Sequence, residues 1–194
     1  MRLFFSKTYK LILSEIDKSL SEINETELND LLAEILKAKK IFVIGAGRMG
    51  LILKAFCMRL NHLGFNTFVV GSVTCPPISS EDLLIVASSS GKTASNLAMV
   101  EKASNYNAKI FTITAELDSP IAKLSTKCLF LKGPSSLYDS NVNKAFSEQP
   151  MKALFEQSLL ILLDSILLIL MQKTGQNIED ISKRHANLEW GVKQ

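Results

Sequence analysis

The segment IFVIGAGRMG, residues 41–50, joins a short apolar run to a glycine-rich turn. Its first four residues, Ile41–Ile44, are all apolar, which is typical of a strand in a parallel sheet that is covered on both faces. Gly45 and Gly47 allow such a strand to turn tightly into a helix, and they leave backbone N–H groups exposed at the start of that helix. The segment therefore predicts the first strand and the first crossover helix of an α/β fold.

Four more strands alternate with helices and turns after this segment. Gly64 is placed to cap the end of the first crossover helix, and Ser119-Pro120 is placed to begin a short one, since proline suits the first helical turn. Strands and helices that alternate at this spacing imply a parallel sheet with right-handed crossovers and helices on both faces. The sequence thus predicts a three-layer αβα sandwich with five strands, at residues 41–44, 65–70, 82–88, 109–114 and 128–131.

Further helices are expected before the first strand and after the last strand in the sequence. Apolar residues recur every three or four positions over residues 9–23, and Asn24 lies three residues before Glu27 in a capping-box-like start, so two N-terminal helices are predicted. The strongly apolar segment Ser158–Met171 is interrupted by Asp164 and is shorter than the roughly 18 residues that a membrane span needs. We expect it to form a long helix in the core or at a subunit contact.

Length and charge limit the class of protein. A chain of 194 residues fits one domain, with N-terminal helices at about 5–39, the sheet and its helices at about 40–173, and a tail at 174–194. The formal charge of +3 argues against nucleic acid or a membrane as the partner. The N-terminus lacks a signal-peptide cleavage site, and the three cysteines are far apart, which favours a reduced, cytoplasmic protein.

The segment VASSSGKT, residues 86–93, resembles the end of a nucleotide-binding P-loop. The opening glycine of that motif is replaced by Val86, and the segment offers a cluster of hydroxyl groups instead. Ser88, Ser90 and Thr93 surround Gly91 between the third strand and a helix, where hydroxyls and helix N–H groups suit a single phosphate. The alternative is that these hydroxyls only cap the helix, although one cap requires only one hydroxyl.

The glycines of residues 45–50 also match the dinucleotide-binding pattern G-x-G-x-x-G. That pattern requires an acidic residue at the end of the second strand to bind a ribose. The sequence there reads VVGSVTCPP, and the next carboxylate is Glu81. NAD is therefore disfavoured. Because the carboxyl ends of parallel strands share one edge, we expect Gly45 and Gly47, in the glycine turn, to lie beside the loop that contains Ser88, Ser90 and Thr93, here called the hydroxyl loop. We expect them to help bind phosphate.

Five segments together resemble the 6-phospho-3-hexuloisomerase family of the sugar isomerase (SIS) domain superfamily. They are GAGR, AFCMRLNHLGF, SSSGKT, QPMKALFEQ and KRHANLE, and the similarity extends from about residue 9 to Glu189. The resemblance implies a flavodoxin-like sandwich, a homotetramer and no metal or organic cofactor. The implied reaction interconverts D-arabino-3-hexulose 6-phosphate and D-fructose 6-phosphate, in the ribulose monophosphate pathway of formaldehyde fixation or detoxification.

The resemblance also assigns roles to particular residues. It makes Glu156 the catalytic base and places His185 near a neighbouring subunit's active site, where it can shuttle protons. Arg48 follows the glycine turn and is expected to pair with phosphate. The predicted substrate-binding set is Gly45, Gly47, Arg48, Ser88, Ser90, Gly91 and Thr93. The sequence departs from the family's usual residues at Met49, Ser89, Lys92, Lys152 and Ala153.

Two other functions are compatible with the same residues. A non-catalytic phosphosugar sensor would keep Ser88, Ser90 and Thr93 and would bind its ligand without turnover. An isomerase of another phosphosugar, such as arabinose 5-phosphate, would turn over an aldose. Turnover with each substrate therefore separates the three hypotheses.

Overall fold

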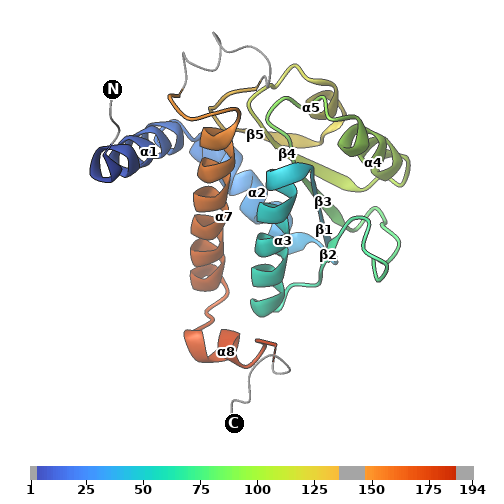
Figure 1. Ribbon diagram of the computed structural model, residues 1–194. Helices are drawn as coiled ribbons and strands as arrows, with labels where there is room; N and C mark the ends of the chain where they lie inside the picture. The colour runs from blue at the N-terminus through green and yellow to red at the C-terminus, as the bar shows by residue number, and fades with distance from the viewer. Residues whose placement is uncertain (1–3, 136–146, 187–194) are drawn as a thin grey trace.

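The computed structural model describes residues 4–135 and 147–186 of the chain, and a five-stranded parallel sheet lies at its centre (Figure 1). The strands follow the order β2-β1-β3-β4-β5, which is the flavodoxin-like order. This confirms the predicted fold class and the predicted number of strands. The strands are β1 (Ile41–Gly45), β2 (Thr67–Val69), β3 (Leu83–Ala87), β4 (Lys109–Thr114) and β5 (Lys127–Phe130).

Helices cover both faces of the sheet, and several begin where the sequence predicts. The side chain of Asn24 accepts hydrogen bonds from the N–H groups of Thr26 and Glu27, and Ser119 caps its helix through Ala122. The helices are α1 (Phe5–Leu20), α2 (Glu25–Lys37), α3 (Gly47–His62), α4 (Ala94–Asn105), α5 (Pro120–Leu124), α7 (Ala153–Lys173) and α8 (Ile178–Ser182).

The two faces of the sheet bury separate hydrophobic clusters. Along β1, Ile41 and Val43 face the larger cluster, whereas Phe42 faces the smaller one, as the alternation of side chains along a strand requires. Helices α2, α3 and α7 contribute to the larger cluster, and α4 and α5 contribute to the smaller one. Figure 1 shows α3 and α7 next to each other on one side of the sheet and α4 and α5 on the other.

Helix α7 is the predicted long apolar helix. It packs against α1 and α3, and nine of its residues are buried. By length and composition it is the one helix among residues 4–135 and 147–186 that could cross a membrane. Its burial in the larger hydrophobic cluster identifies it instead as a core helix, although Leu160, Ile161 and Leu168 remain exposed.

Helix α1 begins at Phe5, where the N-terminal helices were predicted to begin, but it ends at Leu20, before the apolar pattern of residues 9–23 does. Strand β2 is shorter than the predicted 65–70 because it is an edge strand that pairs only with β1. The tail was not assigned a helix, yet α8 forms there with a capping box between Asn177 and Asp180. Residues 136–146, between β5 and α7, lie outside the described residues.

Candidate active site

The hydroxyl loop and the glycine turn begin side by side at the carboxyl edge of the sheet. Strands β1 and β3 are paired in register, with Gly45 opposite Ala87, so the next residues of both strands leave the sheet together. Gly133 follows β5 at the same edge, and a Cβ atom on it would lie 3.2 Å from the Cα of Phe155. The structure therefore brings the hydroxyl loop, the glycine turn and the start of α7 to one edge of the sheet.

The hydroxyl loop is held by its own hydrogen bonds. Ser88 is buried, and its Oγ accepts a 3.1 Å hydrogen bond from the N–H of Gly91. Thr93 is the N-cap residue of α4, but its side chain makes no capping hydrogen bond, and its Oγ1 lies 3.4 Å from the Oγ of Ser88. Ser90 is partly exposed in the same loop. The geometry does not support the alternative that these hydroxyls serve only to cap the helix.

Gly91 is the residue on which the shape of this loop depends. Its φ angle is +57°, in the left-handed region that favours glycine. A Cβ atom at this position would overlap the side chain of Ser119, which caps α5. The carbonyl of Gly91 also accepts a 3.1 Å hydrogen bond from the N–H of Ile121. The loop is therefore packed directly against the start of α5.

The glycine turn places Arg48 next to Glu156. Gly47 is the first residue of α3 and has a φ angle of +58°, and Arg48 follows it in the first turn. The Nη1 of Arg48 donates a 3.1 Å hydrogen bond to the Oε2 of Glu156, which lies in the first turns of α7. The Glu156 side chain is largely buried, whereas that of Arg48 is half exposed. Sequence reasoning paired Arg48 with phosphate and did not anticipate this ion pair, which places a cation beside the predicted base.

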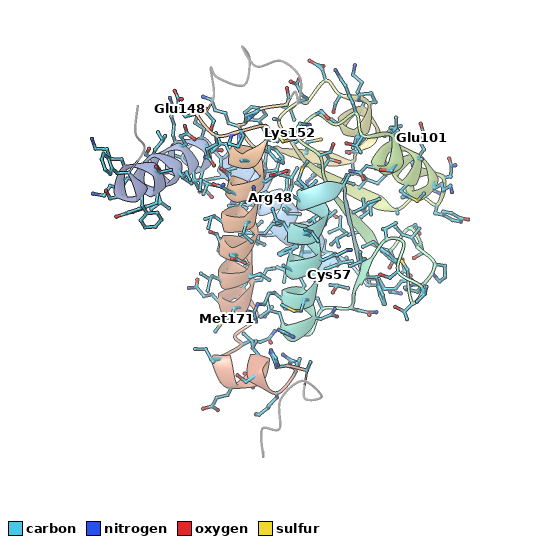
Figure 2. The ribbon with its side chains drawn as sticks, in the orientation of Figure 1. Arg48, Cys57, Glu101, Glu148, Lys152 and Met171 are labelled. Carbon is cyan, nitrogen blue, oxygen red and sulfur yellow. The ribbon has the colours of Figure 1, made fainter. Side chains whose placement is uncertain are left out.

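Lys152 is a charged group at the site that sequence reasoning noted only as a departure from the family. It is the N-cap residue of α7 and only 8% exposed, and Figure 2 shows it at the same end of the helices as Arg48. Burial lowers the pKa of Lys152, and the nearby Glu156 carboxylate acts in the opposite direction. The protein therefore keeps an ammonium group in an environment that disfavours its charge.

We expect Lys152→Met to stabilise the protein at neutral pH. A lysine whose pKa is lowered by folding costs stability while it is protonated, and this cost disappears as the pH rises from the folded pKa toward the unfolded value of about 10.4. The gain should be roughly 1 kcal/mol at pH 7, or about 2–4 °C in Tm, and should shrink above that folded pKa. Thermal unfolding followed by circular dichroism at several pH values measures it. Lys173→Met, at an exposed position of the same helix, is the control and should give no gain.

His185 lies far from Glu156 within one chain. Its ring centroid is 5.1 Å from that of His62 at the end of α3, and Arg184 anchors the segment by a 3.1 Å hydrogen bond to the carbonyl of His62. This segment follows α8, beyond the C-terminal end of α7 (Figure 1). Since Glu156 is near the other end, about 25 Å of helix separates them. The structure does not bring the two predicted catalytic residues together in one chain.

His62 lies in a buried environment that fits a structural role. Burial lowers the pKa of its imidazole, and Arg59 and His185 act in the same direction. Its Nδ1 is buried without a hydrogen-bond partner among the described residues.

The chain belongs to the SIS domain family, whose sequence pattern matches residues 34–137. Two curated relatives have names that are more specific than the family. The 3-hexulose-6-phosphate isomerase of Bacillus subtilis (strain 168) is 39% identical over 178 residues, which cover 92% of this chain and 95% of that protein. The enzyme of the same name from Methanocaldococcus jannaschii is 37% identical over 164 residues, 84% of this chain and 85% of the relative.

A solved structure agrees with these relatives. The crystal structure of a hypothetical protein from Methanococcus jannaschii, for which a molecular function of 3-hexulose-6-phosphate isomerase is inferred, superposes with a TM-score of 0.79. It is 34% identical in sequence, and the match covers 94% of this chain and 99% of that one. The similarity therefore extends over the whole fold, including the helices before and after the sheet.

Proposed function

We propose that this protein is an isomerase that interconverts D-arabino-3-hexulose 6-phosphate and D-fructose 6-phosphate. The relatives named 3-hexulose-6-phosphate isomerase support this substrate, because they match most of the chain. The observation that carries the chemistry is the ion pair of Glu156 with Arg48, at the sheet edge where the hydroxyl loop begins. The ion pair supplies a carboxylate for proton transfer and a cation beside it, and the neighbouring hydroxyl loop suits a phosphate.

The proposed reaction moves a carbonyl group from C3 to C2 of the sugar. Glu156 removes the proton from C2, which gives an enediolate across C2 and C3, and it returns the proton to C3. A proton passes from the oxygen on C2 to the oxygen on C3, so the sugar gains and loses no atoms. One carboxylate can serve both carbons because they are adjacent. No oxidant or reductant is consumed.

The other site residues hold the substrate and its developing charge. The hydroxyls of Ser88, Ser90 and Thr93 donate to the phosphate oxygens, and the start of α4 contributes N–H groups and a partial positive charge. Gly91 gives the loop its shape, and Gly45 and Gly47 allow the backbone to approach closely. Arg48 stabilises negative charge on the enediolate or the phosphate, because its half-exposed guanidinium is available beside Glu156.

Turnover by the purified chain tests this function. D-arabino-3-hexulose 6-phosphate is supplied, and the formation of fructose 6-phosphate is followed through a coupled dehydrogenase; arabinose 5-phosphate is assayed in parallel by ribulose 5-phosphate formation. We expect turnover of the hexulose only. Turnover of the pentose alone would reassign the substrate. Binding of hexulose phosphate without turnover would replace the enzyme with a phosphosugar sensor.

We further propose that the chain assembles into a homotetramer in which His185 reaches a neighbour's site. The distance between Glu156 and His185 along α7 supports this arrangement, because one chain cannot combine them. The exposed apolar side chains Leu160, Ile161 and Leu168 on α7 supply a surface for association. We place the protein in the cytoplasm, where Cys57, Cys75 and Cys128, free in the structure, would stay reduced.

Mixed oligomers of two inactive variants are expected to recover activity. A chain with Glu156→Gln still supplies His185, and a chain with His185→Ala still supplies Glu156, so each mixed pair forms one intact site. Refolding equal amounts together should restore about one quarter of wild-type turnover if the chains assort at random. The measurement is the hexulose assay before and after mixing. Recovery no greater than the sum of the separate variants would place both residues' functions within single chains or remove His185 from catalysis.

A further inference from the structure

A carboxylate of the N-terminal helix binds the segment that leads into α7. The Oε2 of Glu15 accepts hydrogen bonds from the Oγ of Ser147 at 2.6 Å and from the Nε2 of Gln149 at 2.8 Å. Its Oε1 accepts a 2.9 Å hydrogen bond from the backbone N–H of Glu148. The N–H of Gln149 also donates to the Oγ of Ser147, at 2.9 Å. The Glu15 side chain on α1 therefore hydrogen-bonds to three consecutive residues, 147–149, in the segment before α7.

Glu15 is ionised, which strengthens the hydrogen bonds that it accepts from residues 147–149. Partial burial alone raises the pKa of this carboxyl, but the hydrogen bonds from Ser147, Gln149 and Glu148 outweigh the effect and lower the pKa. Glu15 therefore stays ionised at neutral pH, and an ionised carboxylate accepts stronger hydrogen bonds than a neutral group. The ties are lost only in acid, as the pH falls through the lowered pKa.

The segment that Glu15 ties has an irregular backbone. Met151 has a φ angle of +57°, which is uncommon for a residue other than glycine, and its side chain is exposed and gains no burial from this conformation. Lys152 follows as the N-cap of α7, and Glu156 donates its N–H to the Lys152 carbonyl at 3.0 Å. A strained backbone persists only where its surroundings fix it. The hydrogen bonds of Glu15 are contacts of that kind, and they reach the residues two to four positions before Met151.

We infer that Glu15 is a positioning residue for Glu156: it fixes the backbone that enters α7 and thereby holds the carboxylate of Glu156 opposite Arg48. This inference rests on the proposed isomerase function. Glu15 itself touches neither Arg48 nor Glu156 by any hydrogen bond in the described chain. Because a base misplaced by about 1 Å loses much of its rate, loosening this segment should slow proton transfer more than it weakens phosphate binding.

The test compares Glu15→Gln with Asp17→Asn. Both variants remove one carboxylate from α1, but Asp17 is exposed and its side chain makes no hydrogen bond in the described chain. Glu15→Gln should lower kcat about 10- to 100-fold with KM changed less than about 3-fold. Backbone amide exchange in a peptide covering residues 147–153 should become faster in Glu15→Gln. Asp17→Asn should match the wild type in both measurements.

A second variant distinguishes a local effect on this segment from a general loss of folding. Ser147→Ala removes one of the three ties and leaves α1 unchanged, so it should lower kcat in the same direction but less, and it should add little when combined with Glu15→Gln. Unchanged kcat in Glu15→Gln overturns the inference, as does additive behaviour of the two substitutions. If the wild type does not turn over the hexulose, the proposed function fails, and the exchange measurement alone then decides whether Glu15 orders this segment.

Discussion

Glu156→Gln should lower kcat about 10²- to 10⁴-fold, the contribution that a positioned acid–base group makes to proton transfer. Glutamine keeps the shape of the side chain and an oxygen that can accept the hydrogen bond from Arg48, so the site should stay folded. It cannot accept the C2 proton of the sugar. Since the proposed phosphate contacts lie in the hydroxyl loop and not on Glu156, KM should change little. The expected signature is a loss of kcat with binding preserved.

The measurement is steady-state kinetics with D-arabino-3-hexulose 6-phosphate at several concentrations, with Glu101→Gln as the matched control. Glu101 lies exposed on α4, away from Arg48 (Figure 2), and its replacement removes the same charge from the protein. The control should keep wild-type kcat. A Glu156→Gln enzyme within about 10-fold of the wild type would assign the base to another residue.

Gly91→Ala is expected to have the second-largest effect, because it disturbs the hydroxyl loop in two ways. The methyl group would overlap the side chain of Ser119, and the φ angle of +57° is strained for alanine. The loop must therefore move away from α5, which displaces Ser88 and Thr93 from their present positions. We expect KM to rise at least about 10-fold and the free energy of unfolding to fall by roughly 1–3 kcal/mol.

Gly71→Ala is the control for backbone strain at a glycine outside the hydroxyl loop. Gly71 also has a positive φ angle, +91°, but nothing lies within 4 Å of the position a Cβ would occupy. Its replacement should cost only the backbone strain, about 1 kcal/mol, and should leave KM unchanged. Urea unfolding and steady-state kinetics are measured on both variants. An equal rise in KM in Gly71→Ala would show that the effect of Gly91→Ala is not specific to the hydroxyl loop.

Strands β1 and β3 could be predicted because their sequences are nearly uniform in hydrophobicity. Ile41–Ile44 and Leu83–Ala87 are apolar on both faces, and the structure buries both faces beneath helices. The meeting of the glycine turn with the hydroxyl loop followed from the rule that parallel strands end at one edge, and the register of Gly45 with Ala87 confirms it.

The contacts between distant segments could not be predicted in the same way. Glu15 lies 132 residues before Ser147, and the pattern of α1 gives no sign that this carboxylate faces another segment rather than solvent. The burial of Lys152 also depends on tertiary packing around the start of α7. The helix α8 was missed for a different reason, since the spacing of Asn177 and Asp180 was an available capping signal.

The length of α7 restricts insertions and deletions in this helix. The helix runs without interruption from the turn of Glu156 to the turn that leads into α8 and His185. Each residue added to an α-helix rotates everything beyond it by about 100° and advances it by about 1.5 Å. A single insertion between Ser158 and Leu170 would therefore leave Glu156 in place and swing the tail to another side of the molecule. Substitutions at the buried apolar positions after Glu156 can preserve the helix if they keep its apolar character, but its residue count is fixed by the two ends that it joins.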